Sequence, residues 1–202
     1  ADVLYGKMLR SPHAHARIRR IDASKALQLE GVRAVATADD LVATVDKLSH
    51  IGETIVNVRE VAANSLASGK VLYKGHAVAA VAATSPHIAE EALDLIEVEY
   101  EELPAVFDEE EALKPGSSLV HDPRPQQDPA FSSLIGNLSD GGNICSHFKL
   151  RHGDVERGFA EADFVFEDTF RSPAVQHVPL EPHVTVAHYA NGKLTIWTST
   201  QM

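Results

Sequence analysis

A stretch rich in proline and glycine divides the chain into two parts. Residues 114–143 hold eight prolines and glycines among thirty positions. Proline removes a backbone donor and glycine weakens helices and strands, so no long element is expected there. A loop of this length is uncommon inside one compact domain. The sequence therefore predicts a folded part before the stretch, a linker across it, and a second folded part after it.

The composition fits folded domains and argues against several protein classes. The chain has 202 residues, of which 44% are hydrophobic, enough for a core. The longest apolar run, residues 77–83, is too short to span a bilayer, and no apolar leader opens the sequence, so we expect neither a membrane segment nor a signal peptide. A net charge of −11 argues against nucleic-acid binding. The single cysteine, Cys145, excludes an intrachain disulfide and fits a cytoplasmic location.

The negative charge is concentrated in one segment. Residues 90–111 contain eleven acids and no lysine or arginine, whereas the first twenty residues hold five basic side chains and one acid. A solvated helix face followed by an acidic loop is the simpler interpretation. The alternative is a non-catalytic acidic interaction or assembly module, in which this segment docks a basic partner.

The first part alternates strand and helix signals, which predicts an α+β or α/β domain ending near residue 108. Strands are predicted at 3–10, 16–21, 32–36, 70–73, 77–83 and 97–101, and a short helix at 23–30. Thr37 is a candidate N-cap, and Ser85 followed by Pro86 predicts the start of another helix. Residues 47–68 show weak periodicity and are predicted to be irregular.

The second part carries signals for a helix and then for strands. A helix is predicted after Asp154, because apolar residues recur there at helical spacing. Phenylalanines alternating with other residues predict a strand over 164–170, and a short strand is predicted at 148–151. Asn191-Gly192 is the preferred two-residue hairpin turn, and strands are predicted on both sides of it.

Two histidine-containing motifs are candidates for metal binding. His13 and His15 are two residues apart in a predicted strand, so their side chains point the same way, although packing or hydrogen bonding explains them more simply. His177, Glu181 and His183 could bind zinc, with Glu181 as a general acid or base. Their spacing matches no standard zinc signature, so a polar strand–loop segment is the simpler interpretation and a zinc hydrolase is the least favoured function.

Eight stretches resemble, in order, the large molybdenum-binding subunit of the xanthine dehydrogenase/aldehyde oxidase molybdenum hydroxylase family. They are residues 9–18, which include Ser-Pro-His-Ala-His-Ala, then 31–41, 71–82, 89–92, 97–104, 153–163, 180–183 and 194–201. The resemblance implies an α+β fold in three parts. These are an α/β-hammerhead domain at 1–110, a linker at 111–143, and the truncated N-terminal part of a mixed α+β molybdopterin-binding domain at 144–202.

The resemblance also implies an activity. Enzymes of this family hydroxylate aldehydes or electron-poor aromatic heterocycles with oxygen derived from water, using a molybdenum–molybdopterin cofactor. Iron–sulfur clusters and FAD would be held by partner subunits or domains. Gln201, which closes a Ser-Thr-Gln motif, would hydrogen-bond an oxo ligand of the molybdenum, because a neutral amide donates N–H without adding charge. Glu181 would lie near the site and shape it.

Other family motifs are not found in these residues. The glycine-rich cofactor-binding loop, the later pterin-contacting segments and the catalytic glutamate are missing, so the resemblance implies no catalytic residue in this part. Ala77 stands where family members usually carry proline, which costs local rigidity and no chemistry. We therefore expect the isolated chain to bind no molybdenum cofactor and to be inactive. The small-molecule substrate is not indicated by these motifs.

Overall fold

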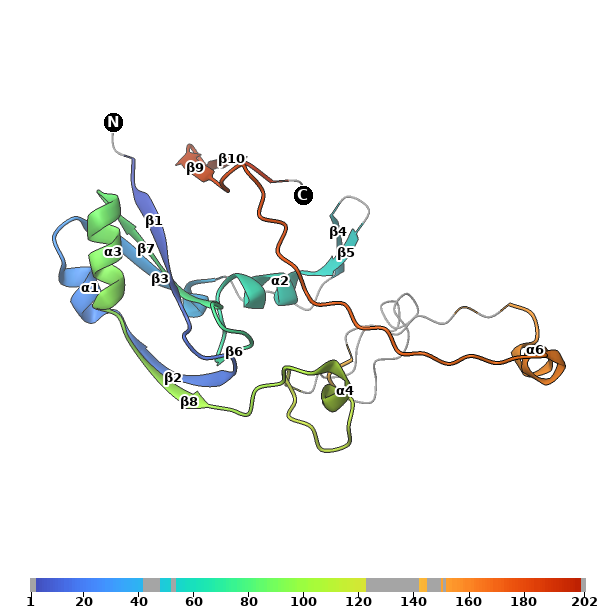
Figure 1. The fold of residues 1–202 in the computed structure, drawn as a ribbon. Coiled ribbons are helices and arrows are strands. Elements are labelled where there is room, and N and C mark those ends of the chain that lie inside the picture. The colour runs from blue at the N-terminus through green and yellow to red at the C-terminus, as the bar shows by residue number, and fades with distance from the viewer. Residues whose placement is uncertain are drawn as a thin grey trace. The chain divides into compact units, whose positions relative to one another are not determined.

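The chain forms two compact units, Ala1–Lys149 and Leu150–Met202, and both contain helical and strand segments (Figure 1). The computed structural model describes residues 3–41, 48–51, 54–122, 142–144, 150 and 152–200. Within these ranges, none of the helices has the length and apolar character that a membrane crossing requires. The two units are described separately below.

The first unit is built around a three-stranded antiparallel sheet with β7 at its centre (Figure 1). β7 (Ala77–Ala83) pairs with β1 (Tyr5–Arg10) on one side and with β3 (Val32–Thr37) on the other. Helices α1 (Ser24–Gln28) and α3 (Pro86–Asp94) pack on this sheet and on each other. The buried residues of this core are Ala26, Ala79, Val81, Ala83, Ala89, Ala92 and Ile96.

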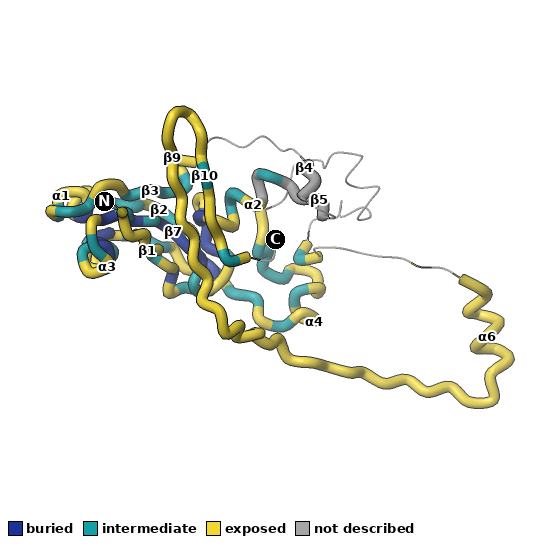
Figure 2. The backbone as a smooth tube through the Cα atoms, turned by 90° about the horizontal axis from the view of Figure 1, so that it is seen from above, coloured by how far each residue is buried: buried dark blue, intermediate teal, exposed yellow. Residues whose placement is uncertain are grey.

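A second three-stranded sheet has β2 at its centre. β2 (Ala16–Asp22) pairs antiparallel with β6 (Lys70–Val71) and with β8 (Glu97–Glu102). Its apolar side belongs to a core cluster of Ala16, Ala67, Val71 and Val78. Val78 comes from β7, so the run Ala77–Ala83 supplies both clusters. Burial on both faces explains why this strand reads as a continuous apolar run. Figure 2 shows these buried residues in the first unit.

Helices begin at the N-caps that the sequence predicts. Thr37 caps the 3-10 turn η1 (Ala38–Asp40), where its hydroxyl accepts a hydrogen bond from the N–H of Asp39 at 3.3 Å. Ser85 caps α3, where its hydroxyl accepts from the N–H of Ile88 at 3.2 Å. Each bond satisfies a backbone donor that the first helical turn leaves free, which stabilises the helix start by about 1 kcal/mol.

The acidic segment at 90–111 lies against the basic start of the chain. In the register of β2 and β8, Arg17 is opposite Glu101 and Arg20 is opposite Glu99. Ion pairs between the two segments are Lys7–Glu90, Arg19–Glu101 and Lys25–Glu97. These pairs are exposed and each contributes little stability. They show that three of the eleven acids meet basic side chains of the same unit, which supports the interpretation as a solvated face.

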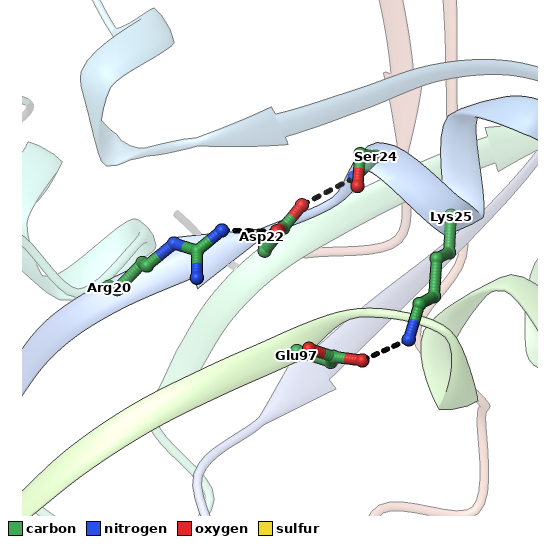
Figure 3. A network of polar contacts seen from close by, with 5 residues as sticks. All are labelled: Arg20, Asp22, Ser24, Lys25 and Glu97. Carbon is green, nitrogen blue, oxygen red and sulfur yellow. Dashed lines mark hydrogen bonds and ion pairs between the residues drawn. The ribbon is translucent and has the colours of Figure 1, made fainter.

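The turn from β2 into α1 is fixed by a polar network (Figure 3). The Asp22 carboxylate accepts a hydrogen bond from the N–H of Ser24 at 3.0 Å and pairs with Arg20. Hydrogen bonds from Ser24, and then the Arg20 charge, hold the pKa of Asp22 below its usual value. The hydrogen bond from Lys25 to Glu97 raises the pKa of Lys25 and ties α1 to β8.

The prediction that residues 47–68 are irregular is wrong. They contain β4 (Leu48–Ile51), β5 (Thr54–Asn57) and α2 (Val58–Ser65), and the two strands form an antiparallel pair. Strands of four residues offer too few alternating positions for periodicity to reveal them.

The chain folds back after α4 (Glu109–Ala112). The Asn143 side chain accepts a hydrogen bond from the N–H of Val120 at 2.9 Å. Its amide donates to the carbonyl oxygens of Ser118, at 2.9 Å, and Ala112, at 3.2 Å. One asparagine therefore satisfies several backbone groups that no helix or strand would pair. These bonds hold residues 112–120 and Asn143 together within the first unit.

Gly31 occupies a position that other residues fit poorly. It lies between α1 and β3 at φ +94°, a conformation that favours glycine. A Cβ there would lie 2.7 Å from Ile88 Cδ1 and 2.7 Å from Thr84 Oγ1. We expect Gly31→Ala to lower the free energy of unfolding by about 2–4 kcal/mol, because backbone strain and a steric clash act together. Urea unfolding followed by circular dichroism measures this loss.

Gly75→Ala is the matched control for the clash. Gly75 has a similar φ of +90°, yet nothing lies within 4 Å of a Cβ at this position. Only backbone strain of about 1–2 kcal/mol is expected. Equal losses in the two variants would show that the contact with Ile88 and Thr84 carries no cost.

In the second unit the described elements are one helix and one hairpin. α6 (Val155–Glu161) begins after its N-cap Asp154, as predicted. β9 (Thr185–Ala190) pairs antiparallel with β10 (Lys193–Thr198). The turn residues Asn191 and Gly192 have φ of +51° and +76°, which confirms the predicted hairpin turn.

The strand predicted at 164–170 is wrong, because the structure shows an extended segment there without strand pairing. Phe164, Phe166 and Phe170 are 81–90% exposed, and Figure 2 shows this part of the second unit as exposed throughout. An alternating pattern becomes a strand only where a neighbouring strand pairs its backbone groups. The strand predicted at 148–151 lies outside the described residues, Leu150 excepted.

Candidate functional site

Two described residues of the candidate motifs in the second part, Pro182 and Ser199, meet at the open end of the β9–β10 hairpin. There the hydroxyl groups of Thr185 and Thr198 are hydrogen-bonded at 2.8 Å. The N–H of Ser199 donates to the carbonyl oxygen of Val184 at 3.1 Å. The backbone pairing of β9 and β10 therefore continues one step beyond Thr185 and Thr198, toward the two candidate motifs.

Ser199 joins these two motifs. Its hydroxyl accepts a hydrogen bond from the N–H of Val184 at 2.9 Å and donates to the carbonyl oxygen of Pro182 at 3.3 Å. Pro182 follows Glu181 directly, and Ser199 stands two residues before Gln201. The structure thus brings the Leu-Glu-Pro motif beside the start of the Ser-Thr-Gln motif. Glu181 is exposed, and Gln201 itself lies outside the described residues.

The role of Ser199 was not predicted from the sequence. The only sequence feature that points to this role is its position immediately after the strand that follows the Asn-Gly turn. A hydroxyl there can reach the backbone next to the paired strand. The described part of the candidate site therefore combines hydroxyl groups with one carboxylate, and the Ser-Thr-Gln motif adds an amide in sequence. Hydroxyl and amide groups donate hydrogen bonds without adding charge, so this set suits a ligand that presents oxygen acceptors.

The backbone is strained three residues before Glu181. Val178 has φ +51°, which is rare for a β-branched residue, and it precedes Pro179, which disfavours helical conformations. Conformations of this kind cost about 1–3 kcal/mol and occur more often at functional sites than elsewhere. Nothing in the amino-acid pattern indicated this strain.

The N-terminal histidines are held by contacts within the first unit. His15 is buried, and its Nδ1 donates to the carbonyl oxygen of Pro104 at 2.8 Å. The His13 ring packs edge-on against Tyr100, with 4.9 Å between ring centroids, and its Nδ1 lies 3.5 Å from a Glu102 oxygen. This geometry supports the packing and hydrogen-bonding interpretation of both histidines.

The alternative zinc site gains no support from the geometry. His177, Glu181 and His183 are all exposed and lie on an extended segment. In the part of the chain that the structure describes, no three or more His, Cys, Asp or Glu residues form a group that could hold a metal ion.

Comparison with known families identifies both units. Residues 1–104 match the family described as aldehyde oxidase and xanthine dehydrogenase, a/b hammerhead domain, and residues 138–202 match the molybdopterin cofactor-binding domain. The chain belongs to the aldehyde oxidase and xanthine dehydrogenase family. The family and the α+β fold class predicted from the sequence are confirmed.

The curated relatives are considerably longer than this chain. It is 36% identical over 200 residues to a probable xanthine dehydrogenase component of Bacillus subtilis (strain 168), covering 98% of this chain and 23% of that protein. It is 35% identical over 201 residues to the nicotinate dehydrogenase large molybdopterin subunit of Eubacterium barkeri, covering 99% and 41%. The chain thus spans less than half the length of each relative.

Solved structures share the fold. A crystal structure of quinoline 2-oxidoreductase from Pseudomonas putida 86 matches with a TM-score of 0.73 at 33% identity, over 98% of this chain and 23% of that chain. A Cu,Mo-CO dehydrogenase in the carbon monoxide reduced state matches with a TM-score of 0.69 at 33% identity, over 96% and 24%. Both matches extend over nearly the whole chain and therefore include both units.

Proposed function

We propose that this chain is part of the large subunit of a molybdenum-cofactor-dependent oxidoreductase, which oxidises or hydroxylates an aldehyde or (hetero)aromatic substrate with oxygen derived from water. The observation that carries the proposal is the succession of a hammerhead match and a molybdopterin-domain match along one chain. In this proposal the hammerhead domain covers 1–110, a linker covers 111–143, and the first part of the cofactor domain covers 144–202.

The open end of the β9–β10 hairpin would contact the cofactor. When bound, the molybdenum–molybdopterin group supplies the redox chemistry of substrate oxidation. The neutral donors of the Ser-Thr-Gln motif fit a group that presents oxygen acceptors, and the Gln201 amide would donate to an oxo ligand of the molybdenum. Glu181, held nearby through the Pro182–Ser199 hydrogen bond, would shape the site. A paired strand end is a rigid support for such contacts.

The proposed holoenzyme includes other redox groups. Iron–sulfur clusters and FAD would reside on partner subunits or domains, and the complex would be cytoplasmic and take a small-molecule substrate. The alternative of a non-catalytic acidic module is weakened by the first unit, because acids of residues 90–111 pair with Lys7, Arg19 and Lys25.

The cofactor content of the purified 202-residue chain tests the proposal that these residues supply only part of the cofactor site. We expect no stoichiometric molybdenum and no dye reduction, because the open hairpin end supplies only a few contacts for a large cofactor. Elemental analysis and a dye-reduction assay with xanthine, nicotinate and an aldehyde measure both properties.

The full-length subunit, expressed with its partners, is the positive control and is expected to show both molybdenum and turnover. Turnover by the isolated chain would contradict its predicted inactivity. Absence of molybdenum from the full-length complex would contradict the proposed function itself.

A further inference from the structure

Lys70 is a buried cation in the first unit. It lies on β6 and is 7% exposed. Its Nζ is 3.0 Å from Oδ1 of Asp122, a residue 52 positions later in the chain. A lysine is rarely buried unless its charge is paired. The Asp122 side chain is 65% exposed, so the carboxylate reaches a cation that the fold has already buried.

Two further nitrogen-bearing side chains lie near the Lys70–Asp122 pair. Arg17 on β2 is the cross-strand partner of Lys70, so both side chains lie on the same face of this sheet. His15 precedes Arg17 by two residues, immediately before β2 begins. Both interact electrostatically with Asp122. Together with the hydrogen bond from Lys70, the largest contribution, they hold the pKa of Asp122 below its usual value.

One atom of this group has an unmet hydrogen-bonding capacity. His15 is 5% exposed, and its Nδ1 is engaged by the carbonyl oxygen of Pro104. Its buried Nε2 has no hydrogen-bond partner among the described residues. A buried polar atom in this state costs about 1–3 kcal/mol, so it favours an additional polar ligand. Because Nδ1–H donates to Pro104, Nε2 of the neutral ring is a hydrogen-bond acceptor, and only the charged ring would offer a hydrogen to a carboxylate oxygen.

We propose that His15, Arg17 and Lys70, here called the basic cluster, form a carboxylate-binding site, occupied in this chain by Asp122. The cluster brings the charged donors Arg17 and Lys70 from β2 and β6, with His15 beside them, and charge-assisted hydrogen bonds to a carboxylate are stronger than neutral ones. Occupation by Asp122 fastens the segment after α4 to β6. The basic cluster shares no residue with the set proposed to contact the cofactor.

Acetate is the probe for this site. In an Asp122→Ala variant we expect the His15 ring signals, followed by nuclear magnetic resonance, to shift saturably as acetate is added. The unsubstituted chain should need at least about tenfold more acetate for the same shift, because a tethered carboxylate acts at a millimolar or higher effective concentration. Adding Lys70→Met to the Asp122→Ala variant should abolish the saturable shift.

Glu102→Ala is the matched control, because it removes another carboxylate that faces a histidine, in this case the half-buried His13. No saturable binding of acetate is expected at that position. A folded Asp122→Ala variant without a saturable shift at His15 would overturn the proposal, as would equal binding to the unsubstituted chain.

A cross-linking experiment tests the occupied state without any substitution. A carbodiimide joins an amine and a carboxylate in contact through an amide bond, with loss of water. Mass spectrometry of the treated 202-residue chain should identify a Lys70–Asp122 cross-link. The exposed Lys114–Glu111 ion pair is the internal control for the reaction. A control cross-link without the Lys70–Asp122 product would overturn the proposal, even if the Asp122→Ala variant failed to fold.

Discussion

Replacement of His76 by alanine is expected to lower the free energy of unfolding by about 3–5 kcal/mol. The ring is fully buried between β6 and β7. Its Nε2 donates to the carbonyl oxygen of Ala63 at 3.1 Å, and its Nδ1 accepts from the N–H of Leu72 at 3.3 Å. It also stacks on Tyr73, with 4.5 Å between ring centroids. Alanine would leave a cavity and two partly buried backbone groups without partners.

Two variants separate these contributions in urea unfolding followed by circular dichroism. His87→Ala removes an exposed histidine of α3 and is expected to change stability by no more than about 0.5 kcal/mol. His76→Gln keeps a donor for Ala63 and part of the volume, so its loss should fall between the other two. A loss below about 1 kcal/mol for His76→Ala would show that the ring does not connect α2 to the turn before β7.

The pH dependence of stability identifies the same site independently. Burial lowers the pKa of His76, so the folded chain favours the neutral ring. The unfolded chain titrates near pH 6.5. As the pH falls below about 6.5, the unfolded chain gains a proton here before the folded chain does, and the free energy of unfolding decreases. The stabilisation is complete above this value. His76→Gln should lack this component, so the difference between its pH profile and that of the unsubstituted chain isolates it.

The predictions that hold rest on local chemistry. Ser85 and Thr37 cap helices because a side-chain oxygen beside a free N–H is a contact within a few residues. The Asn191-Gly192 turn depends only on two backbone conformations. By contrast, the strands within 47–68 are four residues long, and nothing local separates them from a loop. The strand predicted at 164–170 from its alternating pattern is absent for a different reason. A strand forms only beside a neighbouring strand that pairs its backbone, and a sequence pattern does not show whether such a neighbour exists.

The contacts that build the candidate site join residues far apart in the sequence. Counts of charge revealed an acidic segment and a basic one, but only the β2–β8 register shows that they face each other. The Leu-Glu-Pro and Ser-Thr-Gln motifs were visible separately. Their proximity depends on one hydroxyl, Ser199, which bonds to Pro182 and Val184. Side-chain bonds of this kind follow from three-dimensional geometry, so a linear pattern does not predict them.

The Gln201→Ala variant of the full-length subunit, assembled with its partners, should lose about 10²-fold in kcat while its molybdenum content stays unchanged. The proposed role of Gln201 is to donate an amide hydrogen bond to an oxo ligand, and loss of one well-placed donor at a reacting centre costs about this factor. KM should change little, because the amide would contact the cofactor and not the substrate. Steady-state kinetics normalised to molybdenum measure both parameters.

Three further variants test whether the amide itself is responsible. Gln201→Glu removes the N–H donors and adds a negative charge beside an oxygen acceptor, so its kcat should fall at least as far. Ser199→Ala breaks the bonds to Pro182 and Val184 but leaves the amide, so a smaller loss is expected. Gln28→Ala, on the exposed end of α1, should change nothing. If molybdenum content fell in proportion to activity in Gln201→Ala, the amide would retain the cofactor and would not tune it.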